Sequence, residues 1–105
     1  MSLSIKRLNE VMRNPKTYSQ TKALYSYLWV RADNKSGLSY PPKKQILSEV
    51  NLTEKLYNEC LGVLLNIGYI RETTKELTDD KGKKYTIKAY DLNDYSQNKQ
   101  QRLKI

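Results

Sequence analysis

The sequence predicts an α+β fold in which four helices precede a β-hairpin. Two observations support this prediction. Apolar residues recur at a spacing of three or four over most of residues 3–67, which is the period of helices with one buried face. Beyond Gly68, two segments rich in Tyr, Ile and Thr flank an Asp/Gly turn, as in a hairpin. The chain has 105 residues, so we expect one domain with one core.

Residues 3–13 predict a short amphipathic helix. Ile5, Leu8 and Met12 recur at helical spacing between charged residues, and Asn14-Pro15 ends the pattern. Such a helix needs an apolar surface to lie on.

Residues 19–32 are apolar on most sides and predict the central helix of the core. Trp29 falls on the polar line of this helix with Lys22 and Ser26, so the only tryptophan points away from the main apolar arc. A terminal segment or a second subunit is therefore expected to cover it.

A helix-turn-helix is predicted in the middle of the chain. After a turn at 33–37 and a short strand at 38–40, Pro42 is expected at the first position of a helix that runs to about Val50. A second helix is predicted three residues later, over 54–67.

The helix over 54–67 has clear start and stop signals. Thr53 supplies the hydroxyl oxygen of a good N-cap, and Gly68 is a favourable C-terminal stop. The side expected to face the core consists of Leu56, Tyr57, Cys60, Leu61, Leu64 and Leu65. The opposite side is expected to be free and consists of Lys55, Asn58, Glu59, Gly62 and Asn66.

The hairpin is predicted from strands at 69–77 and 83–92. Asp79-Asp80 lies in the turn between them, where aspartate is an ordinary turn residue, so we do not interpret the pair as a metal site. The alternation of apolar residues shifts within the second strand, which predicts a bulge near Ala89. The polar residues 94–105 are expected to be a frayed tail or a last helix that uses Leu103.

Composition excludes several classes of function. With no histidine and a single cysteine, Cys60, the chain has no Cys/His zinc site, Ser-His-Asp triad or internal disulfide, and a reducing cytoplasm is expected. We expect no enzyme activity, no cofactor and no metal. There is no apolar run long enough to span a membrane. The net charge of +8 favours a polyanionic partner, with nucleic acid first.

The order helix, short strand, helix, helix, hairpin resembles the winged helix-turn-helix domains of phage and plasmid replication proteins, and more distantly the N-terminal domain of the primosomal protein DnaD. The resemblance covers about residues 19–92 and is most specific in the Tyr40-Pro41 pair and in the spacing Thr53, Leu61, Leu64, Gly68-Tyr69-Ile70. It implies an N-terminal arm at 1–17, a winged-helix domain at 18–93 with a three-helix core, and a tail at 94–105.

The resemblance also implies that the exposed side of the helix over 54–67 enters the major groove of double-stranded DNA. Thr53, Lys55 and Asn58 are then the candidate contacts on this helix. Glu54 and Glu59 depart from the basic pattern, since a carboxylate repels phosphate unless it accepts from cytosine. The remaining candidates precede the helix or surround the hairpin, and they are Lys43, Lys44, Lys81, Lys83, Lys84 and Lys88.

A homodimer is predicted from apolar residues in excess of what one small core needs. Its candidate interface residues are Ile5, Leu8, Met12, Trp29 and Leu103. Gly62 costs a helix about 1 kcal/mol relative to Ala, which a close approach by DNA, a partner or a neighbouring helix would explain.

Two functions are compatible with these patterns. The first is a DNA-binding regulator or replication accessory of phage, plasmid or bacterial type, which the overall positive charge favours. The alternative is a protein-interaction or oligomerisation module of a replication protein with little direct DNA readout, which Glu54 and Glu59 favour.

Overall fold

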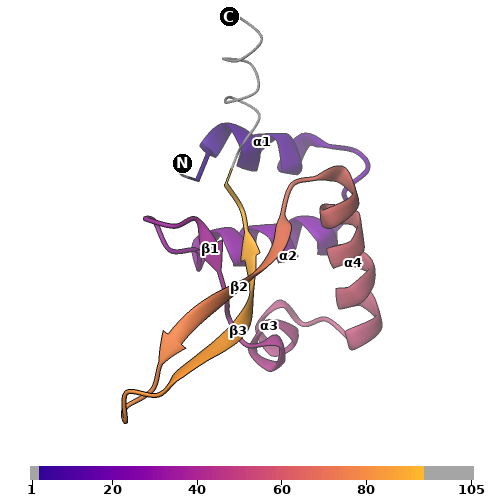
Figure 1. Cartoon of the computed structure of the whole chain (residues 1–105). Coiled ribbons are helices and arrows are strands. Elements are labelled where there is room, and N and C mark those ends of the chain that lie inside the picture. Colours follow the sequence, from indigo (N-terminus) through magenta and orange to yellow (C-terminus); the bar gives the residue numbers. More distant parts are fainter. Residues whose placement is uncertain (1–2, 94–105) are drawn as a thin grey trace, which may run out of the picture.

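The structure is a computed structural model that describes residues 3–93. Its elements are α1 (Ile5–Arg13), α2 (Ser19–Val30), β1 (Leu38–Ser39), α3 (Lys43–Val50), α4 (Glu54–Ile67), β2 (Arg71–Thr78) and β3 (Lys84–Asp91) (Figure 1). Within these residues, four helices and a three-stranded antiparallel sheet confirm the predicted α+β class. Their order is compatible with the winged-helix-like arrangement expected from the sequence. The predicted tail at 94–105 lies outside the described residues.

The predicted helix boundaries are corrected by their caps. Ser4 is the N-cap of α1, since its Oγ accepts a hydrogen bond of 3.1 Å from the backbone N–H of Arg7, and α1 therefore begins at Ile5. The second helix ends at Val30, with Arg31 as its C-cap, two residues before the predicted end. Pro42 has an extended backbone and is the N-cap of α3 rather than its first helical residue.

The turn between α3 and α4 begins at Asn51, which adopts the left-handed conformation at φ 62°. Asparagine tolerates this conformation better than most residues with a side chain. Thr53 caps α4 as predicted, because its Oγ1 accepts from the backbone N–H of Leu56 at 3.2 Å. At the other end, Gly68 terminates α4 at φ 94°.

The buried side of α4 agrees with the prediction except at Leu56. Tyr57, Cys60, Leu61 and Leu64 are buried, whereas Leu56 is 36% exposed. Adjacent residues are about 100° apart around a helix axis, so Leu56 stands at the margin of the arc that Tyr57 occupies. The prediction that Leu56 faces the core is therefore wrong.

The sheet has the order β1-β3-β2, and β3 is its central strand. Pairing of β2 with β3 is continuous from Arg71↔Asp91 to Thr78↔Lys84, so the predicted bulge near Ala89 is absent. Instead, Ala89 and Tyr90 are both buried, although adjacent side chains in a strand point to opposite faces. The apolar pattern shifts because the sheet is covered on both sides here, while the outer half of the hairpin is exposed.

The hairpin turn is organised by Asp79. Its Oδ1 accepts from the backbone N–H of Lys81 at 2.9 Å and of Lys83 at 2.8 Å. This confirms Asp79 as a turn residue, and it places both lysines at the end of the hairpin.

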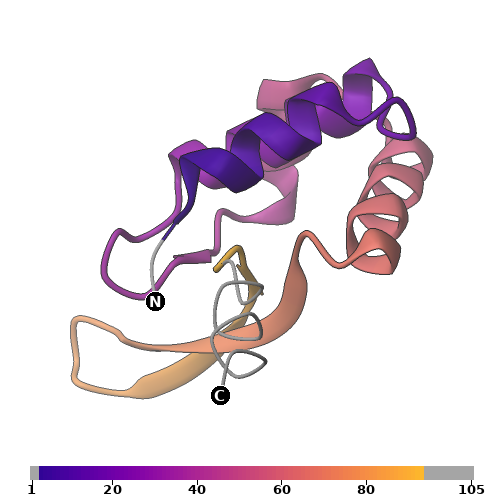
Figure 2. The same ribbon diagram turned by 90° about the horizontal axis from the view of Figure 1, so that it is seen from above.

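The central position of α2 is confirmed. Leu24, Tyr25 and Leu28 are fully buried, and α1, α3 and α4 all pack against α2. In both ribbon views α1 runs alongside α2, and the hairpin projects away from the helices (Figures 1 and 2). No helix among residues 3–93 is long and apolar enough to cross a membrane.

The first helix shares this core. Val11 is fully buried. The guanidinium of Arg7 lies 5.3 Å from the centre of the Tyr69 ring and donates to the carbonyl of Gly68 at 3.4 Å. Asn14 donates from Nδ2 to the Tyr69 hydroxyl at 3.0 Å. These contacts attach α1 to the segment that follows α4.

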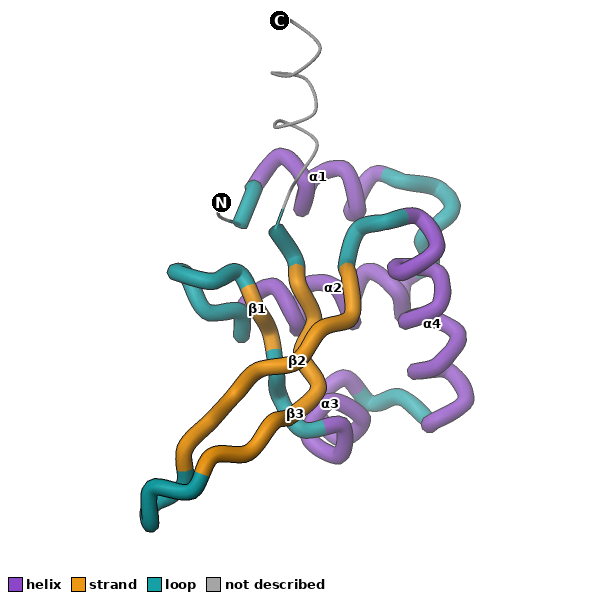
Figure 3. Tube along the Cα trace, viewed as in Figure 1, coloured by secondary structure: helices purple, strands orange, loops and turns teal. Residues whose placement is uncertain are grey.

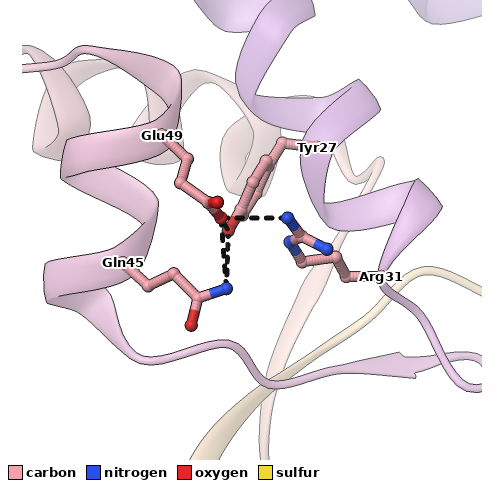
Figure 4. Close-up of polar contacts among 4 residues, drawn as sticks. All are labelled: Tyr27, Arg31, Gln45 and Glu49. Carbon is pink, nitrogen blue, oxygen red and sulfur yellow. Dashed lines mark hydrogen bonds and ion pairs between the residues drawn. The ribbon is translucent and has the colours of Figure 1, made fainter.

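A polar network joins α2 to α3 (Figure 4). The carboxylate of Glu49 accepts hydrogen bonds from the Tyr27 hydroxyl, from Arg31 at 2.9 Å and from Gln45 at 3.1 Å. The Arg31 guanidinium also stacks 4.4 Å from the centre of the Tyr27 ring. These hydrogen bonds, led by that from Tyr27, lower the pKa of Glu49 below its usual value.

Gly62 and Gly68 provide a matched pair of substitutions. A Cβ at either position would meet no atom within 4 Å, but only Gly68 has a positive φ. We expect Gly62→Ala to raise the free energy of unfolding by about 1 kcal/mol, because Ala favours a helix interior. Gly68→Ala should lower it by about 1 kcal/mol, because Ala is strained at positive φ. Urea unfolding measures both values, and a gain in stability from Gly68→Ala would contradict the assigned C-cap.

The Glu49 network predicts a dependence of stability on pH. A carboxylate whose pKa is lower in the folded chain stabilises it fully above the unfolded value of 4.5, and this contribution is lost as the pH falls through the folded pKa. When the pH falls below 4.5, the free energy of unfolding of Glu49→Gln should therefore decrease less than that of the parent chain. Urea unfolding across this range measures the difference, with Glu59→Gln as the control. Identical pH profiles for Glu49→Gln and the parent would contradict the network.

Candidate nucleic-acid interface

A cleft of about 280 Å³ lies between the start of α3, the first half of α4 and the second half of β3. Its lining residues are Tyr40, Pro41, Pro42, Lys43, Tyr57, Asn58, Leu61, Ile87, Lys88 and Tyr90. Three segments that are distant in sequence thus build one site, because α4 and β3 both pack onto the core beside the start of α3.

Three of the predicted DNA contacts line this cleft. They are Lys43 from α3, Asn58 from α4 and Lys88 from β3. The sequence predicted each separately, and the fold brings them to one place.

The other predicted DNA contacts lie around the cleft or beyond it. Lys44 is exposed beside Lys43, and Thr53 and Lys55 are exposed at the start of α4. Figure 3 shows the hairpin turn far from the helices, and this is the region that carries the exposed Lys81, Lys83 and Lys84. The turn is therefore not part of the cleft.

Three of the candidate lysines form ion pairs that the sequence did not predict. Lys43 pairs with Glu54 at 2.9 Å, Lys88 with Glu72 at 3.2 Å and Lys84 with Glu76 at 3.9 Å. All six side chains are well exposed, so each pair contributes only about 0 to 1 kcal/mol. A phosphate can replace the carboxylate at small cost, but the local positive charge is lower than the sequence indicates.

The other four candidate lysines form no ion pair with any residue of the described range 3–93. These are Lys44, Lys55, Lys81 and Lys83. They are exposed, and their full charge is available to an anion.

The exposed side of α4 offers polar groups and open space. Thr53 uses its oxygen as the acceptor for Leu56 N–H, so its hydroxyl proton is still able to reach a phosphate. Asn58 and Glu59 are exposed. A Cβ at Gly62 would meet nothing within 4 Å, so no neighbouring helix within residues 3–93 explains the glycine.

The inner wall of the cleft contains a tyrosine pair. The hydroxyls of Tyr57 and Tyr90 lie 3.0 Å apart, and both side chains are buried. Burial, followed by the hydrogen bond between the two hydroxyls, raises the pKa of Tyr90 well above its usual value, so its hydroxyl stays protonated. The sequence predicted Tyr57 as a core residue but not its pairing with Tyr90, because that pairing depends on how β3 packs against α4.

The predicted interface residues differ in how much surface they expose. Leu8, Met12 and Trp29 are partly buried and pack against the core of their own chain. Ile5 is 68% exposed, and Leu103 lies outside the described residues. The apolar surface that these residues offer to a second subunit is therefore smaller than the sequence suggests.

No protein-family model matches this chain, and no curated protein matches it. Among residues 3–93, no group of three or more Cys, Asp or Glu side chains is placed to hold a metal ion.

Proposed function

We propose that this protein is a winged helix-turn-helix protein that binds double-stranded DNA, as a transcription regulator or replication accessory in the cytoplasm. One observation carries the proposal: Lys43, Asn58 and Lys88, predicted separately as DNA contacts, line a single cleft beside the exposed side of α4. Among residues 3–93, no carboxylate lines this cleft, although Glu54 and Glu72 pair with its two lysines.

In the proposed mechanism, α4 provides base contacts and the lysines provide phosphate contacts. Asn58 can form a bidentate pair with adenine, while Lys55 reaches guanine or a phosphate at the start of the same helix. Lys81 and Lys83, which have no ion pair within residues 3–93, contact the DNA backbone from the hairpin turn. Most of the affinity then comes from phosphate contacts and depends on salt.

The alternative is a protein-interaction module of a replication protein. It is favoured by the charge of α4, where Glu54 and Glu59 are exposed against a single lysine, Lys55. A basic partner surface would complement this helix better than DNA does. The predicted homodimer is compatible with both functions, and within residues 3–93 Ile5 is its most exposed apolar candidate.

The phosphate contacts predict a specific salt dependence. Lys81→Ala combined with Lys83→Ala should weaken binding to all duplexes alike and flatten the slope of log K against log salt by about 0.9 per lost contact. Anisotropy at several salt concentrations measures this slope. Lys6→Ala with Lys16→Ala removes equal charge from α1 and the segment that follows it, and should change the slope less. Equal slopes for both variants would remove the hairpin from the mechanism.

Glu54 and Glu59 distinguish the two functions. If α4 lies in a DNA groove, Glu54→Gln should strengthen nonspecific duplex binding more than Glu59→Gln, because it also releases Lys43 from its ion pair. If α4 faces a protein, both variants should leave duplex affinity unchanged and weaken association. Anisotropy and sedimentation of the same variants measure the two outcomes. No effect in either assay would contradict both functions for this face.

A further inference from the structure

The residues that line the cleft between α3, α4 and β3 are suited to a flat, anionic molecule. Three residues with ring side chains, Tyr40, Pro41 and Pro42, line one part, and Leu61 and Ile87 line another. The charged side chains that line it are two lysines, Lys43 and Lys88. Its volume of about 280 Å³ is just below the range of small-ligand pockets, ~300 to 1,000 Å³, which suits a fragment as small as a single base.

The tyrosine pair leaves one hydrogen-bond donor unused at this cleft. Two hydroxyls carry two protons, and the hydrogen bond between Tyr57 and Tyr90 uses one of them. Within residues 3–93, neither hydroxyl makes another hydrogen bond. Both residues are 4% exposed and both line the cleft, so within residues 3–93 the second proton has no partner. An acceptor atom on a molecule in the cleft would satisfy it.

We propose that this cleft receives one unpaired nucleobase, together with its phosphate, from the nucleic acid that α4 and the hairpin bind. The inference rests on the proposed DNA-binding function and adds a substrate preference to it. A nucleobase combines a flat ring for the aromatic walls with acceptor atoms for the spare hydroxyl, and its phosphate suits Lys43 and Lys88. In an intact duplex the faces of the bases are stacked, so the base must be unpaired before it enters.

The test compares three labelled DNAs by anisotropy at one salt concentration, with the full chain. They are a fully paired duplex, the same duplex with one bulged nucleotide, and that duplex with an abasic bulge. We expect the bulged DNA to bind about tenfold more tightly than the other two. The abasic DNA keeps the phosphates and the bend, so the difference isolates the base.

Two variants test whether the preference for bulged DNA depends on the cleft. Tyr57→Phe combined with Tyr90→Phe removes both hydroxyls, which leaves no lone buried hydroxyl and should preserve the fold. Ile87→Trp fills the cleft from the side of β3. Each should reduce the preference for the bulged base while retaining affinity for the paired duplex. Lys81→Ala with Lys83→Ala should weaken all three DNAs and keep their ratio.

The outcomes separate the two proposals. If no DNA binds, the proposed function fails. If all three DNAs bind equally well, DNA binding stands and this inference is overturned. A bulge preference that persists in both cleft variants overturns it as well. The last experiment measures binding of a free deoxynucleoside monophosphate. If this nucleotide binds but the bulged DNA is not preferred, the cleft is a site for a small ligand, and the proposal that it receives a base from a DNA strand is overturned.

Discussion

Burial of α2 is the constraint on which the rest of the structure depends. Its residues Leu24, Tyr25 and Leu28 form an apolar side that must be covered in water, whereas Val30 at its C-terminal end is 73% exposed. Three helices pack against it, and Leu24, Tyr25 and Leu28 lose all contact with solvent. The directions of α1, α3 and α4 are therefore set by one shared neighbour.

The position of the candidate site follows from this arrangement. α4 must turn its apolar side toward α2, which leaves Asn58 and Glu59 exposed on the other side. β3 is positioned in turn by the hydrogen bond between the Tyr57 and Tyr90 hydroxyls and by its place between β1 and β2. Residues of both elements line the cleft. The hairpin continues outward, away from the helices (Figures 1 and 3).

The surface around the cleft contains carboxylates beside its lysines, so it is less positive than the net charge of +8 indicates. Carboxylates of Glu54, Glu72 and Glu76 each lie against one candidate lysine. The remaining positive charge is at Lys44, at the start of α4 and in the hairpin turn. A partner with regularly spaced negative charges can replace the carboxylates in these weak surface pairs. The paired lysines then contribute to binding only when the phosphates come close enough to displace the glutamates.

The sequence by itself determined the element types and most helix limits, because caps, stops and apolar periods act over a few residues. Thr53 and Gly68 are examples, since each acts on the turn of helix beside it. It also determined which side of α4 is free, except at Leu56. Tertiary structure decided the continuous register of β3 at Ala89, the pairing of Tyr57 with Tyr90, and the meeting of Lys43, Asn58 and Lys88 at one cleft. These features depend on contacts between segments that are 15 to 45 residues apart in the sequence. Local sequence patterns extend over only a few residues and therefore do not predict such contacts.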